Sequence, residues 1–281
     1  MVRIFTDSSA DFEPEELAAL GIESVPLTVS FGNETFREGI EITKDNFYAR
    51  MAAEGAFPKT SQPTTADFLE ALEGVKRDGD SAVGIFLSSG LSGTWQGACL
   101  AREMLEYEDF YPVDSLTATC GLRILVEAAV RFRDAGLSAA EIAAKIEALR
   151  SRIRIFASLA TLENLRRGGR ISPTAAAIGN AVHLRPVLRV TKEGTLEIPA
   201  KVIGTVRGIA SVAKQFLMRE ADPAYPVYLI YAHNKENAYA LREKLKKAGV
   251  EIPEKNVKNL GAVIGSHIGP NAFGIAFVEK E

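Results

Sequence analysis

The segment that most constrains the fold is residues 88–94, which reads Ser-Ser-Gly-Leu-Ser-Gly-Thr. It lies between an apolar run at 82–87 and a helix-like run at 95–105. A strand that leads through a short Gly/Ser loop into a helix brings hydroxyl groups together with the unpaired N–H groups of the helix's first turn. The helix dipole favours negative charge at the same place. The segment therefore predicts a strand–loop–helix unit whose loop binds an anion or an oxygen that carries charge.

The first half of the chain alternates between strand-like and helix-like segments. We expect extended segments at 3–6, 22–31, 82–87 and 110–113, and helices at 14–20, 45–53, 65–75, 95–105, 118–133 and 139–150. This alternation is typical of a mostly parallel sheet flanked by helices. Ligands of such sheets bind at the carboxyl ends of the strands, where the loops that begin at Asp7, Ser88 and Asp114 are expected.

The second half has a different pattern. Strands are expected at 154–159, 187–191, 196–203, 227–231 and 273–278, and helices at 161–167, 174–182, 205–220 and 237–248. Lys192-Glu193-Gly194 predicts a hairpin turn between two of these strands. We therefore expect an α/β fold of two domains with the ligand between them. Residues 1–152 form an N-terminal domain with a mostly parallel sheet, and residues 153–281 form a C-terminal α/β (α+β-like) domain with a hairpin.

Composition excludes several classes of function. With 281 residues, 47% of them hydrophobic, the chain can bury the cores of two domains. Its net charge of −3 gives no electrostatic basis for non-specific nucleic-acid binding. It contains no apolar stretch near the roughly 18 residues that span a bilayer, and its N-terminus does not resemble a secretory signal. We expect a cytoplasmic protein without stable membrane insertion. Cys99, Cys120 and the three histidines lack ligand spacing, so neither a metal nor a cofactor is expected.

The loop at 88–94 does not match the common nucleotide-binding motifs, and it matches a hydrolase motif only in part. It lacks the Gly-Lys-Ser/Thr ending of a phosphate-binding loop and the third glycine of a dinucleotide fingerprint. Gly90-Leu91-Ser92-Gly93-Thr94 half-matches the Gly-x-Ser-x-Gly nucleophile elbow, with Thr94 in place of the second glycine. A Ser/His acyl hydrolase acting on lipid esters or thioesters, with His267 as base, therefore remains the alternative function. A helix cap alone, or a carrier of another small carboxylate or phosphorylated ligand, also remains open.

Three further polar segments have no full explanation as helix caps or turns. In residues 59–65, capping accounts for Thr64 and Thr65 but leaves Thr60, Ser61 and Gln62 without a role. In residues 162–172, arginines at a helix end complement its dipole, but Arg170 lies beyond the double glycine that stops the helix. In residues 265–274, His267 is expected in a rigid Gly/Pro-framed loop, which favours a site over a purely structural histidine.

Taken together, five motifs occur along the chain in a fixed order: Thr6-Asp7-Ser8-Ser9, Thr60-Ser61-Gln62-Pro63, residues 88–94, residues 162–172 and His267-Ile268-Gly269-Pro270. In this set and order the chain resembles the DegV family of bacterial fatty-acid-binding proteins. These are the lipid-carrier subunits of fatty acid kinase, and the resemblance covers the whole chain. It implies a non-catalytic protein of phospholipid metabolism that buries one long-chain fatty acid, such as palmitate, stearate or oleate, between its domains. It also implies that a separate catalytic subunit, the kinase, converts the presented carboxylate into an acyl-phosphate. One departure is Arg185-Pro186, where the family favours Lys-Pro.

The resemblance also implies roles for individual residues. The residues expected to bind the fatty-acid carboxylate are Thr60, Ser92, the backbone N–H of Gly93 and His267. Further polar residues expected nearby are Ser61, Asp7 and Ser8. Arg170 and Arg207 are expected on the surface that faces the kinase. The helix at 174–182 is expected to line the acyl tunnel through Ala175, Ile178 and Ala181.

Overall fold

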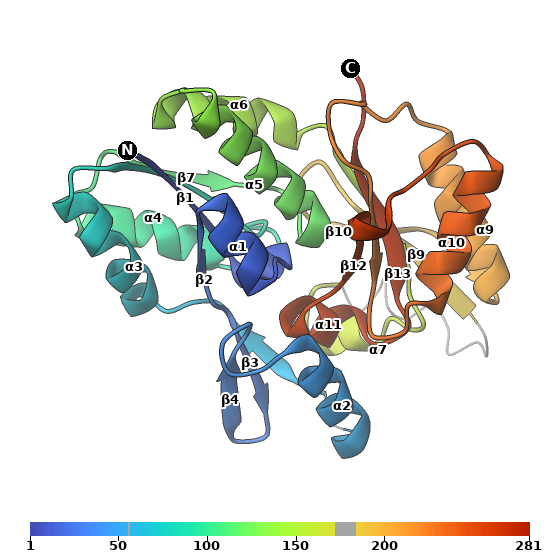
Figure 1. Ribbon diagram of the computed structural model, residues 1–281. Coiled ribbons are helices and arrows are strands. Elements are labelled where there is room, and N and C mark those ends of the chain that lie inside the picture. The colour runs from blue at the N-terminus through green and yellow to red at the C-terminus, as the bar shows by residue number, and fades with distance from the viewer. Residues whose placement is uncertain (56, 172–183) are drawn as a thin grey trace.

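The computed structural model describes residues 1–55, 57–171 and 184–281, and its main body contains two sheets with helices on both faces of each (Figure 1). The helix expected at 174–182, with its proposed tunnel residues, lies outside the described residues.

The N-terminal sheet is four-stranded and parallel, in the order β2-β1-β6-β7. Its strands are β1 (Val2–Asp7), β2 (Ile22–Val25), β6 (Ser81–Phe86) and β7 (Phe110–Asp114). Because β1 leads to β2 on one side and β6 pairs on its other side, the strand order reverses between β1 and β6. In sheets of this kind the carboxyl ends at such a point form the ligand-binding crevice. The predicted parallel sheet is confirmed.

The C-terminal sheet is six-stranded and mixed, in the order β10-β9-β8-β13-β11-β12. Its strands are β8 (Ile153–Ser158), β9 (Leu184–Val190), β10 (Leu196–Ile203), β11 (Tyr228–Tyr231), β12 (Val257–Asn259) and β13 (Phe273–Val278). Strands β9 and β10 form the predicted antiparallel hairpin, and Gly194 in its turn has φ 76°, which glycine adopts without strain. The predicted α/β second half with a hairpin is confirmed.

Helices α5 (Thr119–Asp134) and α6 (Ala139–Arg150) lie between the two sheets (Figure 1). One hydrophobic cluster joins Ile4 and Val83 of the parallel sheet, Leu125 of α5, and Ile155 and Ile230 of the mixed sheet. Ser138 opens α6 with the predicted capping box, its hydroxyl accepting from the backbone N–H of Glu141. The two sheets therefore share a core across these helices.

The outer faces carry the other helices. Helices α3 (Thr65–Arg77) and α4 (Thr94–Met104) cover the parallel sheet, and α9 (Thr205–Leu217) and α10 (Glu236–Lys247) cover the mixed sheet. The shorter helices are α1 (Pro14–Leu20), α2 (Lys44–Glu54), α7 (Glu163–Arg167), α11 (Ala262–Ile268) and the 3-10 turns η1 (Ser8–Ala10) and η2 (Glu254–Asn256).

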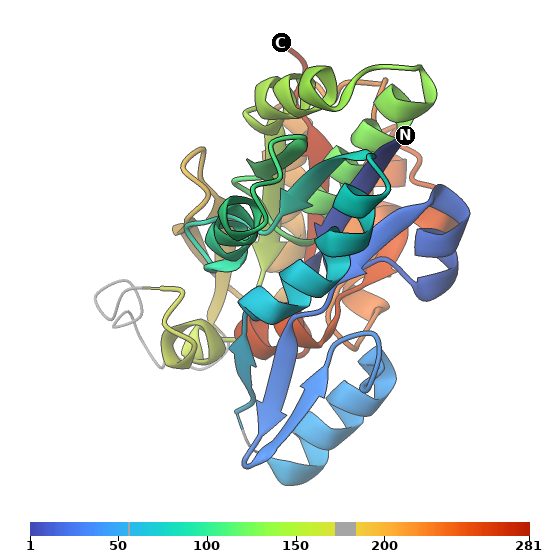
Figure 2. The same ribbon diagram turned by 90° about the vertical axis from the view of Figure 1, so that its left-hand side faces the viewer.

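A small third sheet was not predicted. It has the order β4-β3-β5, with β3 (Thr28–Phe31), β4 (Glu34–Arg37) and β5 (Lys59–Ser61), and projects with α2 below the parallel sheet (Figures 1 and 2). The single extended segment expected at 22–31 is wrong in this respect, because it divides at Pro26-Leu27 into strands of two different sheets. Proline has no N–H to continue a ladder, which explains the break.

Candidate functional site

A narrow apolar cavity of about 80 Å³ lies between the two halves of the chain, with polar groups gathered in one part of its wall. Its apolar lining comes from both halves and includes Leu27, Leu87, Ala118, Ile155, Ala157, Leu188, Ile230, Val263 and Ile264. Its polar lining consists of Thr60, Ser61, Gln62, Ser92, Thr119, Arg170 and His267. Thr60, Ser92 and His267, predicted from separate motifs, are thus brought to the same cavity.

Two buried aspartates fix the loop that carries Ser92. Asp7, at the end of β1, accepts a hydrogen bond from the backbone N–H of Leu87 at 2.7 Å. Asp114, at the end of β7, accepts from the N–H of Ser89 at 3.0 Å. Because β6 lies between β1 and β7, the loop that follows it is held from both sides. The loop is also bonded to the other half of the chain, because the Ser88 hydroxyl donates to the Gly194 carbonyl at 2.7 Å.

The loop ends at the first turn of α4, as the sequence predicts. Gly93 is the N-cap of α4, which has no side-chain cap, so its first N–H groups are available to a ligand. A Cβ at Gly93 would overlap the Gln62 amide oxygen, which explains the need for glycine here. The Ser92 hydroxyl lies 2.8 Å from the Thr94 hydroxyl, and the contact leaves one of the two free to donate elsewhere.

His267 lies in the last turn of α11, so the expectation of a Gly/Pro-framed loop is wrong at this residue. The helix does end beside it, at Gly269, where φ is 71°. The Nε2 atom of His267 is 2.8 Å from the Thr60 hydroxyl oxygen, across 207 residues of sequence. Thr60 itself lies in strand β5 rather than in the expected loop.

The surroundings of His267 keep its imidazole neutral. Burial, together with the nearby Arg170 cation, lowers the pKa of His267 to about 4. Its buried Nδ1 has no hydrogen-bond partner among the described residues, and it packs against Gly168, where a Cβ would overlap it. A neutral imidazole that donates from Nε2 to the Thr60 oxygen leaves the Thr60 O–H free to donate into the cavity.

Among the described residues that line the cavity, Arg170 brings the single fixed positive charge. Its Nε donates to the Leu91 carbonyl at 3.0 Å and its Nη1 to the Gly168 carbonyl, so the guanidinium joins the Ser88–Ser92 loop to the end of α7. It is partly buried, and this burial lowers its pKa. Arg207, in the first turn of α9, is exposed and does not line the cavity. The kinase-facing role of both arginines stays a prediction.

The remaining predicted polar residues divide between two places. Ser61 lines the narrow cavity, but Asp7 and Ser8 line a second, larger pocket of about 560 Å³. Asp7 also accepts from the hydroxyl and N–H of Ser9, and burial raises its pKa to about 6. Asp7 therefore acts on the cavity through the backbone of Leu87 and not by facing it.

Sequence reasoning missed three residues that shape the site. Gln62 was quoted in a motif, but its contact with Gly93 could not be read from the sequence. Asp114 was expected at a strand end, and its bond to Ser89 follows from the order of the sheet. Glu38, in a segment with no recognisable pattern, accepts a hydrogen bond from the N–H of Val263 at the start of α11.

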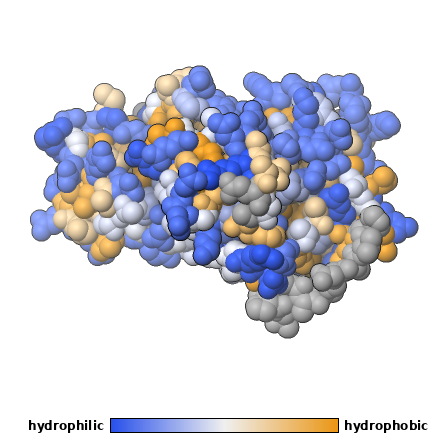
Figure 3. All heavy atoms as spheres, turned by 90° about the horizontal axis from the view of Figure 1, so that it is seen from below, coloured by the Kyte–Doolittle hydropathy of each residue, from blue (hydrophilic) through white to orange (hydrophobic). Residues whose placement is uncertain are grey.

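Other kinds of site find little support in the part of the chain that is described. No cluster of three or more His, Cys, Asp or Glu residues is placed there to hold a metal ion. Among the described helices, none has the length and apolar character needed to cross a membrane. On the face drawn in Figure 3, apolar residues occur in small groups among hydrophilic ones, outside the grey atoms.

The fold and the cavity define a class: a two-domain α/β protein with a narrow apolar cavity that has polar side chains in one part of its wall. The profile of the DegV family, described as "Uncharacterised protein, DegV family", matches residues 1–280, and the chain belongs to this family. A DegV domain-containing protein of Clostridium acetobutylicum is 33% identical over 280 residues, covering 99% of each chain.

Solved structures of similar proteins cover the same length. A DegV family protein from Thermus thermophilus, described by its fatty acid binding, is 31% identical with a TM-score of 0.88 and covers 99% of each chain. A stearic acid-binding protein from Eubacterium ventriosum is 27% identical with a TM-score of 0.90, covering 100% of this chain and 99% of that one. The similarity therefore includes both sheets.

Proposed function

We propose that this protein binds one long-chain fatty acid in the narrow cavity and presents its carboxylate to a separate kinase, which forms the acyl-phosphate. The observation that carries the proposal is the polar part of an otherwise apolar cavity, where Thr60, Ser92, His267 and Arg170 meet. The fatty-acid-binding proteins of the same fold support it. Acyl-phosphate formation needs a nucleoside triphosphate, which agrees with the cytoplasmic location we propose.

The energetics favour a ligand of this kind. At about 0.8 kcal/mol for each CH₂, a sixteen-carbon chain contributes about 12 kcal/mol once the walls of the narrow cavity open to enclose it whole. Association costs roughly 4–15 kcal/mol, so the fit of the chain decides the affinity. A buried carboxylate without partners would cancel the gain. The hydroxyls of Ser92 and Thr60 and the N–H groups at the start of α4 supply donors, and Arg170 supplies compensating charge.

The contacts of Ser92 favour binding over nucleophilic attack. The described bond of its hydroxyl is to Thr94, and His267 bonds to Thr60 instead. A nucleophile needs a base within hydrogen-bond reach that a third group orients. Because Nδ1 of His267 has no partner among the described residues, the geometry favours a carrier without catalytic residues of its own.

Extraction of the purified protein with organic solvent, followed by mass spectrometry, tests the proposed ligand. We expect near-stoichiometric free fatty acid from the wild type, and about tenfold less from the double variant Ser92→Ala/Thr60→Val, which lacks both hydroxyl donors. Thr35→Val is the matched control, because Thr35 lies in the same small sheet with its hydroxyl bonded to Ser30 at an exposed position. No lipid in the wild type, or turnover of acyl esters that disappears in Ser92→Ala, would reject the proposal.

A further inference from the structure

Helix α11 forms part of the wall of the narrow cavity. Val263, Ile264 and Ile268 line it, and His267 in the last turn adds the polar contact. Although α11 belongs to the second half of the chain, residues of the first half contact it at both ends. At its carboxyl end the contact is the bond between His267 and Thr60.

At the other end, two carboxylates from the first half take the place of a local cap. Gly261, the N-cap of α11, provides no side chain, and its backbone N–H donates to Asp11 Oδ1 at 2.7 Å. The N–H of Val263 donates to Glu38 Oε1 at 2.8 Å. These acceptors satisfy N–H groups that a helix leaves free, and their negative charge is favourable at a helix N-terminus.

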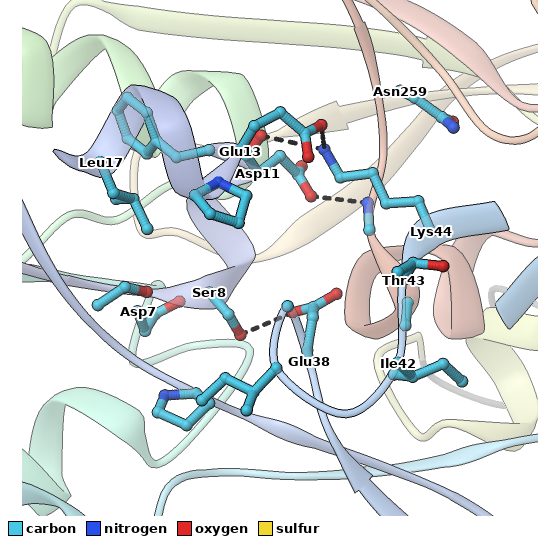
Figure 4. A pocket seen from close by; sticks show the side chains of 18 of the residues that line it. Asp7, Ser8, Asp11, Glu13, Leu17, Glu38, Ile42, Thr43, Lys44 and Asn259 are labelled. Carbon is cyan, nitrogen blue, oxygen red and sulfur yellow. Dashed lines mark hydrogen bonds and ion pairs between the residues drawn. The ribbon is translucent and has the colours of Figure 1, made fainter. Parts of the chain in front are cut away.

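The two carboxylates are themselves held in place. Thr119 donates to Asp11 Oδ2 at 2.6 Å, and Ser8 donates to Glu38 Oε2 at 2.7 Å. Lys44 extends toward Asp11, where it donates to the backbone carbonyl at 3.2 Å, and it also pairs with Glu13 (Figure 4). Asp11 and Glu38 are 2% and 7% exposed, so they form a nearly solvent-free acceptor pair.

The two carboxylates also require a glycine at position 261, where α11 begins. A Cβ at Gly261 would overlap Glu38 Oε1 and lie 2.9 Å from Asp11 Oδ1, so glycine alone fits between the two carboxylates. Burial, together with the nearby Asp11, raises the pKa of Glu38 to about 7. A neutral side chain of the same shape therefore suits this position.

We propose that Asp11 and Glu38 are positioning residues of the fatty-acid site: by holding the N-terminus of α11 they set the place of His267 and of the cavity wall. The part of this inference that concerns binding rests on the proposed function, because it is measured as affinity for a fatty acid. Helix α11 has seven residues, which makes it about 10 Å long, so a shift at its first turn reaches the last. The bond from Asn164 to the Ser266 carbonyl, at 3.2 Å, is a further restraint near His267.

The test compares Glu38→Ala with Glu38→Gln, using palmitate affinity and the imidazole NMR resonances of His267. Glu38→Ala removes the acceptor, and we expect about tenfold weaker palmitate binding and a shifted His267 signal. Glu38→Gln keeps an oxygen for Val263 and can donate its amide to the Ser8 oxygen, so both readouts return to wild-type values. Ser138→Ala, which removes the N-cap of the distant helix α6, is the matched control and leaves both unchanged.

Ser8→Ala keeps the test available if Glu38→Ala does not fold, because it leaves the Glu38 carboxylate in place and removes the hydroxyl that donates to Glu38 and accepts from the Leu27 N–H. We expect Ser8→Ala to weaken palmitate binding and to shift the His267 signal, both by less than Glu38→Ala does. Wild-type affinity and an unshifted His267 signal in these variants would overturn the positioning role while the proposed function stands. If the wild type binds no palmitate, the proposed function fails, and the His267 signal still decides whether the carboxylates position α11.

Discussion

At the scale of single residues, His267 shows how the fold controls charge beside the cavity. Its pKa in the folded protein is about 4, below the ordinary 6.5, so folding favours the neutral imidazole. This contribution to the free energy of unfolding is fully present above pH 6.5 and is lost as the pH falls toward 4. The size of the shift corresponds to about 3 kcal/mol.

We therefore predict that His267→Gln reduces the loss of stability between pH 6.5 and 4. Chemical denaturation of both proteins at a series of pH values measures it. The raised pKa values of Asp7 and Glu38 act in the opposite direction, since their contributions are lost as the pH rises through about 6 and 7. Because wild type and variant both contain Asp7 and Glu38, comparing the two proteins at the same pH cancels the contributions of these carboxyl groups. Parallel stability curves for the two proteins would contradict the prediction.

A short motif was enough to predict the polar loop at 88–94 between a strand and a helix, because chemistry and spacing are local there. Ser92 and Gly93 follow from one strand–loop–helix pattern. Other residues depend on contacts between distant segments. Glu38 has no local pattern, and its bond partner Val263 lies 225 residues away. Such a residue becomes visible only when the fold brings the two segments together.

At the scale of elements, α11 illustrates why one helix was missed. It is short and bounded by Gly261 and Gly269, with Gly265 and Ser266 inside it, which usually indicates a loop, and its N-terminus lacks a local side-chain cap. The capping acceptors come from Asp11 and Glu38 instead. By contrast, α6 was predicted from its own capping box, and β13 from its apolar run.

The same argument predicts opposite effects of two Gly→Ala substitutions. Gly261→Ala places a methyl group between the two carboxylates, and we expect it to lower the free energy of unfolding by about 1–3 kcal/mol. Gly74→Ala, within α3, meets no atom closer than 3.8 Å and is expected to raise it by about 0.5–1 kcal/mol. Urea denaturation measures both. A Gly261→Ala variant as stable as the wild type would contradict the described contacts.

At the scale of the whole molecule, the cavity depends on both halves. The loop from one half meets the hairpin turn of the other, where a Cβ at Gly194 would overlap the Ser88 hydroxyl oxygen. The sequence predicted the two kinds of sheet, but neither their shared core through α5 nor the small third sheet that carries Thr60. These features depend on packing between segments far apart in the chain.

The proposed kinase surface makes a prediction at this scale. Arg207→Glu leaves palmitate binding unchanged, because Arg207 is outside the cavity, and lowers acyl-phosphate formation with a cognate kinase about tenfold. Arg77→Glu on α3, whose side chain is 80% exposed, is the matched control with normal phosphorylation. An unchanged rate for Arg207→Glu would remove Arg207 from the interface. Arg170→Glu is expected to impair phosphorylation too, and palmitate binding in this variant shows whether its guanidinium also compensates the carboxylate.

The most direct test of the central claim is a crystal structure of the protein with bound palmitate. We predict a carboxylate within hydrogen-bond distance of the Ser92 and Thr60 hydroxyls, and an acyl chain that follows Val263, Ile264 and Ile268 of α11 between the two sheets. A carboxylate placed elsewhere, or a chain bound in the larger pocket beside Asp11 and Glu38, would contradict it.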